Sequence, residues 1–281
     1  MKKISRRSFL AAAAVSAAAL ALTACGGSAS TASSAAASSV AASSEAASTS
    51  AAAAELTTVE AGKLTMATNA TFPPYEMTTD AGTIEGIDVD TAQAIAEKLG
   101  LELQIDDMDF DAALLSVQQG KADIVMAGVT VTDERKAVMD FSDSYATGIQ
   151  SIIVPEGSDI ASPDDLAGKK IGTQRGTTGY LYCSDDFGED AVVAYDNGLT
   201  AVQALNNGQV DAVVIDNEPA KAYVESNPGL KILDTSYAEE DYAIGMNKSN
   251  TALLEAVNAA LEELKADGTL QSIVDKYIKA E

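Results

Sequence analysis

The chain has 281 residues, a formal net charge of −24 and no histidine or tryptophan. This acidic balance argues against nucleic acid and anionic lipid headgroups as partners. The lack of histidine excludes Ser-His-Asp and Cys-His catalysis and histidine metal sites. The acids form no complete calcium loop, because the run Asp107-x-Asp109-x-Asp111 is followed by Ala112 and not by the glycine that such a loop needs. We therefore expect no cofactor and no metal.

Residues 1–24 resemble an export signal, because four basic residues precede an uncharged stretch that is too short and alanine-rich to span a bilayer stably. The stretch ends in Leu-Thr-Ala-Cys-Gly, which resembles the lipobox of bacterial lipoproteins. We expect cleavage before Cys25 and lipidation of its thiol, which would hold the protein at the outer face of the cytoplasmic membrane. An ordinary secreted protein with a chance cysteine is the alternative. The Arg-Arg pair fits either a twin-arginine signal or the general route.

Residues 25–56 are predicted to be a flexible tether, because the stretch after Cys25 is almost entirely Ser, Ala, Thr and Gly. A coil of about 29 residues has a root-mean-square span of roughly 30 Å, enough to hold a domain off a membrane. Cleavage after residue 24 would remove four positive charges and leave −28. Only Cys183 would then remain beside a lipidated Cys25, so we expect the core, not a disulfide, to provide stability.

Strand-like and helix-like segments alternate from residue 57 onward, which predicts the α/β class. In the first half of this region, the pattern predicts strands 63–68, 101–105 and 124–127. It also predicts helices 88–99 and 112–119, each followed by a glycine. The second half predicts strands 170–173, 191–194 and 212–215 and helices 199–207 and about 219–225. The run Ser162-Pro163-Asp164-Asp165 is typical of a helix start, and residues 176–179 are expected to form a tight loop.

Residues 116–125 and 204–213 repeat one pattern of helix, glycine, aspartate and buried strand at matching spacing. A generic helix-to-strand connection would look similar, so the repeat only supports two related lobes. It places the segment from Gly128 to Arg135 after one strand and Asp216 after its counterpart. Ligands of open α/β sheets bind at that end of the strands. A cation and an anion would then face each other across two lobes.

Several short motifs, in this order and spacing, resemble the amino-acid-binding branch (family 3) of bacterial solute-binding proteins, the ligand-capturing subunits of ABC importers. They are ATNATFPPY at 67–75, GIDVD at 86–90, MDF at 108–110, AGVTVTDER at 127–135, DFSDSY at 140–145, LAGK at 166–169 and ADGT at 266–269. The resemblance implies a periplasmic-binding-protein-like (type II) Venus flytrap of two α/β lobes. Lobe 1 would comprise residues 57–145 plus 243–281, lobe 2 residues 150–239, and the hinge strands would lie near 145–149 and 240–243.

An α-amino acid needs fixed donors for its carboxylate and an acceptor for its ammonium. Arg135 can hold a carboxylate with two N–H groups. The resemblance implies that Gly128, Thr130 and Thr178 complete this clamp, and that Asp216 accepts the ammonium. A surface ion pair of Arg135 with a neighbouring aspartate, and a purely helix-capping role for Asp216, are the alternatives.

The resemblance also implies that the rings of Phe72 and Phe110 enclose the ligand side chain, although plain core packing would suit them as well. Asn69, Gln174 and Arg175 lie in loops that would border this part of the pocket. Relatives that prefer glutamine tend to have an aspartate where this chain has Asn69, and Arg175 would favour an acidic side chain only if it points inward.

The family resemblance therefore implies a monomeric, non-enzymatic binding protein that captures an amino acid, of polar type, and delivers it to an ABC importer permease in the membrane. A ligand-sensing subunit of a signalling system is the first alternative. A dehydratase-type enzyme on the same fold is the second.

Overall fold

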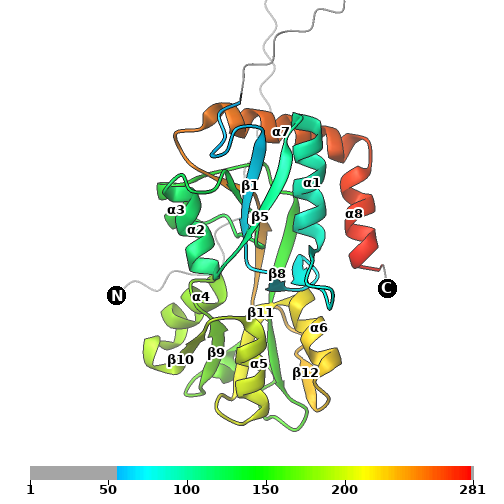
Figure 1. The fold of residues 1–281 in the computed structure, drawn as a ribbon. Helices are drawn as coiled ribbons and strands as arrows, with labels where there is room; N and C mark the ends of the chain where they lie inside the picture. Colours follow the sequence, from blue (N-terminus) through cyan, green and yellow to red (C-terminus); the bar gives the residue numbers. More distant parts are fainter. Residues whose placement is uncertain (1–55, 280–281) are drawn as a thin grey trace, which may run out of the picture. The chain divides into compact units, whose positions relative to one another are not determined.

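The structure, a computed structural model, describes residues 56–279 (Figure 1). The expected signal, Cys25 and nearly all of the expected tether lie outside the described residues. Within the described part, no helix is both long and apolar enough to cross a membrane.

The first lobe is built on a five-stranded sheet with the order β5-β1-β6-β14-β7. Its strands are β1 (Lys63–Thr68), β5 (Glu102–Asp107), β6 (Ile124–Val125), β7 (Asp140–Phe141) and β14 (Gly245–Met246). The central pairs β1–β5 and β1–β6 are parallel, whereas β14 runs antiparallel to both of its neighbours. A small antiparallel sheet follows β1 and consists of β2 (Thr71–Phe72), β3 (Glu76–Thr78) and β4 (Ile84–Glu85).

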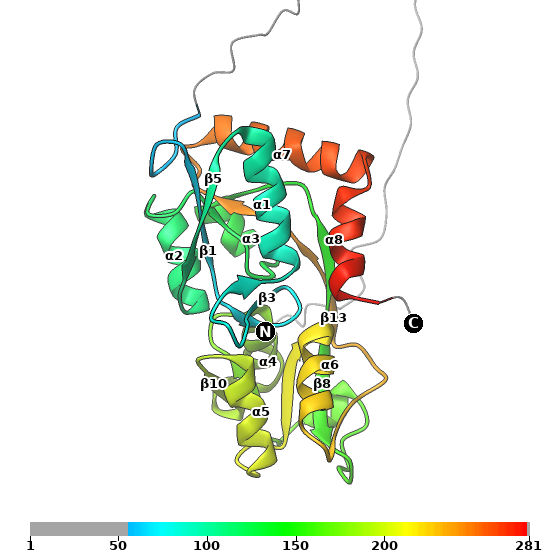
Figure 2. The same cartoon turned by 45° about the vertical axis from the view of Figure 1, so that its right-hand side comes forward.

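Helices cover both faces of the first sheet (Figures 1 and 2). They are α1 (Ile87–Leu99), α2 (Phe110–Gln118), α3 (Asp133–Val138), α7 (Thr251–Ala266) and α8 (Thr269–Tyr277). Because successive side chains of a strand point to opposite faces, Met66 packs with α1 and α7, while its neighbour Ala67 packs with α2. The sheet is therefore buried on both sides.

The second lobe is built on a sheet with the order β10-β9-β11-β8-β12, and β13 also pairs with β8. Its strands are β8 (Ala146–Pro155), β9 (Ile171–Gln174), β10 (Val192–Tyr195), β11 (Ala212–Asp216), β12 (Leu230–Ile232) and β13 (Ala238–Tyr242). Its helices are η1 (Pro163–Leu166), α4 (Thr178–Phe187), η2 (Glu189–Ala191), α5 (Gly198–Asn206) and α6 (Asn217–Ser226). The core clusters place α5 and α6 on one face and α4 with η1 on the other.

Two antiparallel strands connect the lobes (Figure 2). The chain leaves the first lobe through β8 and returns through β13, and the two strands pair from Ala146–Tyr242 to Gln150–Ala238. The side chains of Glu240 and Tyr242 are buried, and those of the alternate residues in β13 are exposed. A Cβ atom at position 148 would lie 2.4 Å from the Tyr242 ring, so only glycine fits there.

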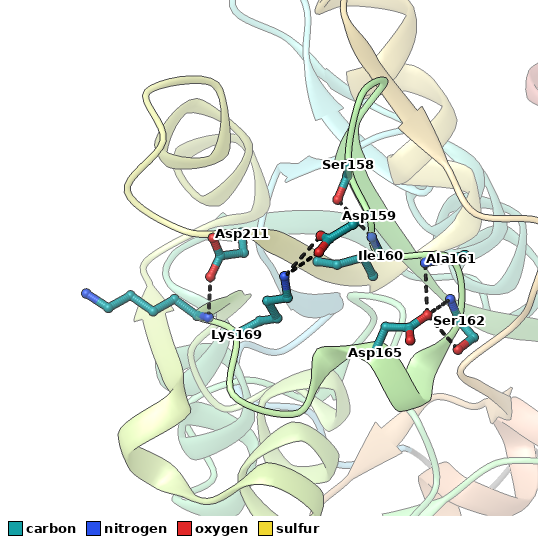
Figure 3. Close-up of polar contacts among 9 residues, drawn as sticks. Ser158, Asp159, Ile160, Ala161, Ser162, Asp165, Lys169 and Asp211 are labelled. Carbon is teal, nitrogen blue, oxygen red and sulfur yellow. Dashed lines mark hydrogen bonds and ion pairs between the residues drawn. The ribbon is translucent and has the colours of Figure 1, made fainter.

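The sequence repeat corresponds to the same local structure in both lobes. Asp123 accepts a hydrogen bond from the Thr65 N–H at 2.8 Å and donates its own N–H to the Thr65 carbonyl. Asp211 makes the same two contacts with Lys170. Asp123 therefore joins its helix-to-strand connection to the first half of β1, and Asp211 joins its own to the residue just before β9. Figure 3 shows Asp211 close to the ion pair between Lys169 and Asp159.

Two helices begin where the sequence analysis predicted a loop or no element. The predicted loop over 176–179 ends early, because Thr177 caps α4 and the helix begins at Thr178. Residues 133–138, for which no element was predicted, form the short helix α3 with Thr132 as its cap. The predicted helix start at Ser162 is confirmed as a 3-10 turn with a capping box between Ser162 and Asp165 (Figure 3).

Candidate functional site

Every residue predicted to bind ligand lines the same pocket, which lies between the lobes. These residues are Asn69, Phe72, Phe110, Gly128, Thr130, Arg135, Gln174, Thr178 and Asp216. The sequence analysis missed other lining residues, namely Glu76, Ala127, Gln150, Thr177, Val214, Ile215 and Tyr242. The site lies beyond the ends of strands β6 and β11, as expected for an open α/β sheet.

Arg135 lies in α3 and is 7% exposed. Its guanidinium donates to the Thr130 carbonyl at 2.8 Å and, across the lobes, to the Gly176 carbonyl at 3.2 Å. It also lies 5.4 Å from the centre of the Phe110 ring. Burial lowers the pKa of Arg135, and the nearby Glu240 carboxylate opposes this effect. Arg135 therefore does not form the surface ion pair that was the alternative interpretation.

The hydroxyl of Thr130, in the first lobe, contacts both Thr178 of the second lobe and Glu240 of β13. It donates to Glu240 Oε2 at 2.9 Å and lies 3.4 Å from the hydroxyl of Thr178. Gln150 donates to the same Glu240 oxygen at 3.0 Å. Because the Thr130 proton is directed at Glu240, Thr178 is the hydroxyl whose proton can turn toward a bound anion.

Asp216 ends β11 and caps α6, and it is 1% exposed. Its Oδ1 accepts from the Glu218 N–H at 3.0 Å, while its Oδ2 accepts from the Ile149 N–H and the Tyr242 hydroxyl, both at 2.9 Å. Burial raises its pKa to about 6, and the three donors limit that rise. Asp216 thus is a helix cap, as the alternative held, and lines the pocket as well.

Aromatic rings form the apolar part of the pocket. Phe72 stacks on Tyr75 with 5.7 Å between ring centres, and Phe110 is buried at the start of α2. Gly128 lies against Phe72: its φ is +56°, and an added Cβ would lie 2.7 Å from the ring. The absence of a side chain at Gly128 leaves room for this ring. The Gly128 N–H donates to the buried Asp88 at 2.9 Å, so it is already hydrogen-bonded within the protein.

Side-chain and backbone contacts join the two lobes at the pocket and beside it. Gln174 donates to the side-chain oxygen of Asn69 at 2.9 Å, and the Tyr223 hydroxyl donates to the Thr71 carbonyl. Arg175, in contrast, does not line this pocket. Its side chain is 55% exposed and lies 3.7 Å from an Asp196 oxygen.

Glu76, at the start of β3, is fully buried and lines the pocket. Neither of its carboxyl oxygens accepts a hydrogen bond from a donor group of the described residues, and the Asp88 carboxyl is its polar neighbour. Burial, followed by the charge of the neighbouring Asp88, raises the pKa of Glu76 well above its usual value. Because no strand was predicted around Glu76, its burial was not visible in the sequence.

The pocket therefore presents a guanidinium from one lobe and a carboxylate from the other. Arg135 can pair with an anionic group, and Asp216 with a cationic one. Aromatic rings belong to the same lining, which suits a small zwitterion with a longer side chain.

Residues 64–280 match bacterial extracellular solute-binding proteins, family 3. A probable histidine-binding protein of Neisseria gonorrhoeae is 35% identical over 77% of this chain and 83% of its own length. The L-cystine-binding protein TcyJ of Escherichia coli K12 is 34% identical over 79% and 85%. The structure of an ancestral arginine-binding protein bound to arginine has 45% identity and a TM-score of 0.74, covering 77% of this chain and 98% of that one.

Proposed function

Because this chain belongs to the bacterial extracellular solute-binding proteins, family 3, we propose that it captures an amino acid and delivers it to an ABC importer permease. Its relatives are binding proteins by name, and we assign it no enzymatic activity. One observation carries the proposal: Arg135 and Asp216 come from different lobes and line the same pocket. This is the arrangement that the two charges of an amino acid require.

The head group of the ligand would bind between these two side chains. Its carboxylate would accept from Arg135 and from the Thr178 hydroxyl, and its ammonium would donate to Asp216. Both protein groups lose hydration on burial, which lowers the pKa of Arg135 and raises that of Asp216. A ligand of complementary charge offsets that loss, so the site favours zwitterions over ligands with a single charge.

The side chain of the ligand is proposed to be cationic. Glu76 lines the pocket, and no donor group of the described residues hydrogen-bonds to its carboxyl oxygens. Asp88 and Glu240 lie directly behind the lining through their bonds to Gly128 and Thr130. Acidic groups thus outnumber the single guanidinium around this pocket, and an extra positive charge on the ligand would be favoured. The arginine and histidine named for the relatives fit this chemistry, and cystine is the polar alternative.

Lobe closure would link binding to transport. Half of the pocket lies on each side of the β8–β13 connection, here proposed as the hinge between residues 57–145 plus 243–281 and residues 150–239. A ligand that bridges both halves stabilises the closed arrangement. The permease would then distinguish closed from open protein by its surface.

Cys25 is proposed to carry the lipid that holds the protein, as a monomer, at the outer face of the cytoplasmic membrane. The lipobox-like run around Cys25 and the extracellular location of the family support this. Expression of the full chain and of Cys25→Ser in a bacterial host tests it: the wild-type protein should remain with the membrane fraction, and the variant should not. Equal distribution of the two would contradict the anchor.

A thermal-shift screen of the protein against the amino acids tests the binding function. L-arginine should raise the unfolding midpoint in a concentration-dependent way, because a ligand that binds only the folded state stabilises it by mass action. Calorimetry on the responding amino acids then gives the affinities. No response to any amino acid would refute the proposal.

A further inference from the structure

Two buried carboxyl groups lie side by side at the edge of the pocket, and their hydrogen bonds are unequal. Asp88, the second residue of α1, accepts from the Tyr145 hydroxyl at 2.7 Å and from the Gly128 N–H at 2.9 Å. Glu76 accepts nothing from the described residues. Both side chains are 0% exposed. Two adjacent buried carboxylates cannot both ionise at low cost, so this pair retains a proton, and the lack of donors places it on Glu76.

The surroundings of the pair reinforce this arrangement. The titratable groups that act on Glu76 are Asp88 from α1, Asp107 from β5 and Asp216 from β11, and all of them raise its pKa. Buried tyrosines, Tyr75, Tyr145 and Tyr223, lie near enough to be affected by its charge. Burial raises the pKa of Asp88 to about 6, and its hydrogen bonds limit that rise. Glu76 lines the pocket, whereas Asp88 lies behind Gly128. A cation that enters the pocket would therefore displace the shared proton from Glu76.

We propose that a cationic ligand side chain displaces a proton from the Glu76–Asp88 pair, so that the preference of this protein for cationic over neutral side chains weakens as the pH falls. The inference rests on the proposed amino-acid binding. At low pH, Glu76 is a neutral carboxylic acid that can donate to an amide or urea oxygen and accept from its N–H. At higher pH, Glu76 is a carboxylate that pairs with a guanidinium. One residue therefore accommodates two ligand classes, and the pH selects between them.

L-arginine and L-citrulline provide the test, because they share the head group and differ in a guanidinium against a neutral urea of nearly the same shape. Calorimetry with the full chain, from pH 5 to pH 8.5, measures both dissociation constants. Protonation of Asp216 weakens the binding of the ammonium group that both ligands share, so its effect cancels in the ratio of the two dissociation constants. We expect the ratio of the citrulline to the arginine dissociation constant to rise at least tenfold between pH 5 and pH 8.

Proton release gives a second measurement on the unmodified protein. Titrations near pH 6.5 in buffers of different ionisation enthalpy should show that arginine releases more protons than citrulline, by about half a proton or more. Equal release by the two ligands would overturn the proposal, as would a ratio that does not change with pH. Absence of binding by either amino acid would instead refute the underlying binding function, and the proposal with it.

Glu76→Gln assigns the effect to this side chain. The variant cannot ionise, so the ratio should lose its pH dependence, and arginine affinity should fall mainly above pH 7. Glu85→Gln is the matched control, because Glu85 lies on β4 of the same small sheet and does not line the pocket. A pH-dependent ratio that persists in the Glu76 variant would overturn the assignment.

Discussion

Removal of the Tyr242 hydroxyl tests whether Asp216 must be ionised to accept the ammonium of the ligand. This hydroxyl donates to Asp216 Oδ2 at 2.9 Å, and both side chains are about 1% exposed. It stabilises the carboxylate form of a group whose pKa burial has already raised to about 6. The substitution Tyr242→Phe deletes the donor and keeps the ring that covers Gly148.

A hydrogen bond to a charged group contributes roughly 1.5–3 kcal/mol, which corresponds to about one to two pKa units. The pKa of Asp216 in the variant should therefore rise to roughly 7–8. At pH 7, half or more of the variant molecules would carry a protonated Asp216, and the dissociation constant for L-arginine should increase about two- to tenfold. At pH 8.5 the carboxylate is largely restored, so the difference from wild type should nearly vanish.

Calorimetric titrations with L-arginine at pH 6, 7, 8 and 8.5 measure this difference. Tyr237→Phe is the control, because its hydroxyl donates to Asp186 at 2.7 Å within the second lobe, away from the pocket. This control should bind like wild type at every pH. A loss in Tyr242→Phe that is the same at all pH values would show that the hydroxyl only supports the structure, and the reasoning about Asp216 would be wrong.

The remaining predictions concern the other charged groups and one glycine. Arg135→Ala should weaken arginine binding at least tenfold in calorimetry without unfolding the protein, because it removes charge-assisted bonds, whereas Arg175→Ala, at the exposed arginine, should bind normally. Gly128→Ala should reduce both affinity and the free energy of unfolding in urea, whereas Gly120→Ala, which has φ +67° and open space around it, should lose only about 1 kcal/mol of stability. Asp216 should lower the free energy of unfolding of the ligand-free protein by about 1.4 kcal/mol between pH 5 and pH 7.5, because its folded pKa of about 6 lies above the unfolded value. Asp216→Asn should remove this contribution.

The sequence predicted the α/β class and strands β1, β5, β6, β9, β10 and β11, because buried strands and glycine-terminated helices leave strong local patterns. The other strands of the first lobe, and β12, were not predicted. The sequence did not predict α4 either, whose segment TGYLYCSDDF lacks a helical stripe. That helix depends on tertiary contacts instead: Cys183 packs against the second sheet, and Thr178 and Gly179 are buried beside it. The Thr177 cap is visible in the sequence only once the helix is known.

The candidate site divides in a similar way. Arg135 and Asp216 could be selected because each follows a buried strand, and their position in one pocket follows from the repeat of that unit in both lobes. Tyr242 and Gln150 could not be selected, because they lie on the connecting strands, whose pairing depends on the whole fold. Whether the selected residues bind ligand in the assigned roles stays a prediction.

The ladder between β8 and β13 limits the ways in which the two lobes can move. Five consecutive residue pairs hold the strands in register. A two-stranded ribbon can bend and twist with its pairs intact, but sliding by one residue would turn Glu240 and Tyr242 from the buried face to the outer face. The lobes can therefore rotate as rigid bodies but cannot shear past each other. An insertion of one residue into β13, whose partner strand is β8, would leave both sheets their own cores while separating Thr130 from Glu240 and Asp216 from Tyr242.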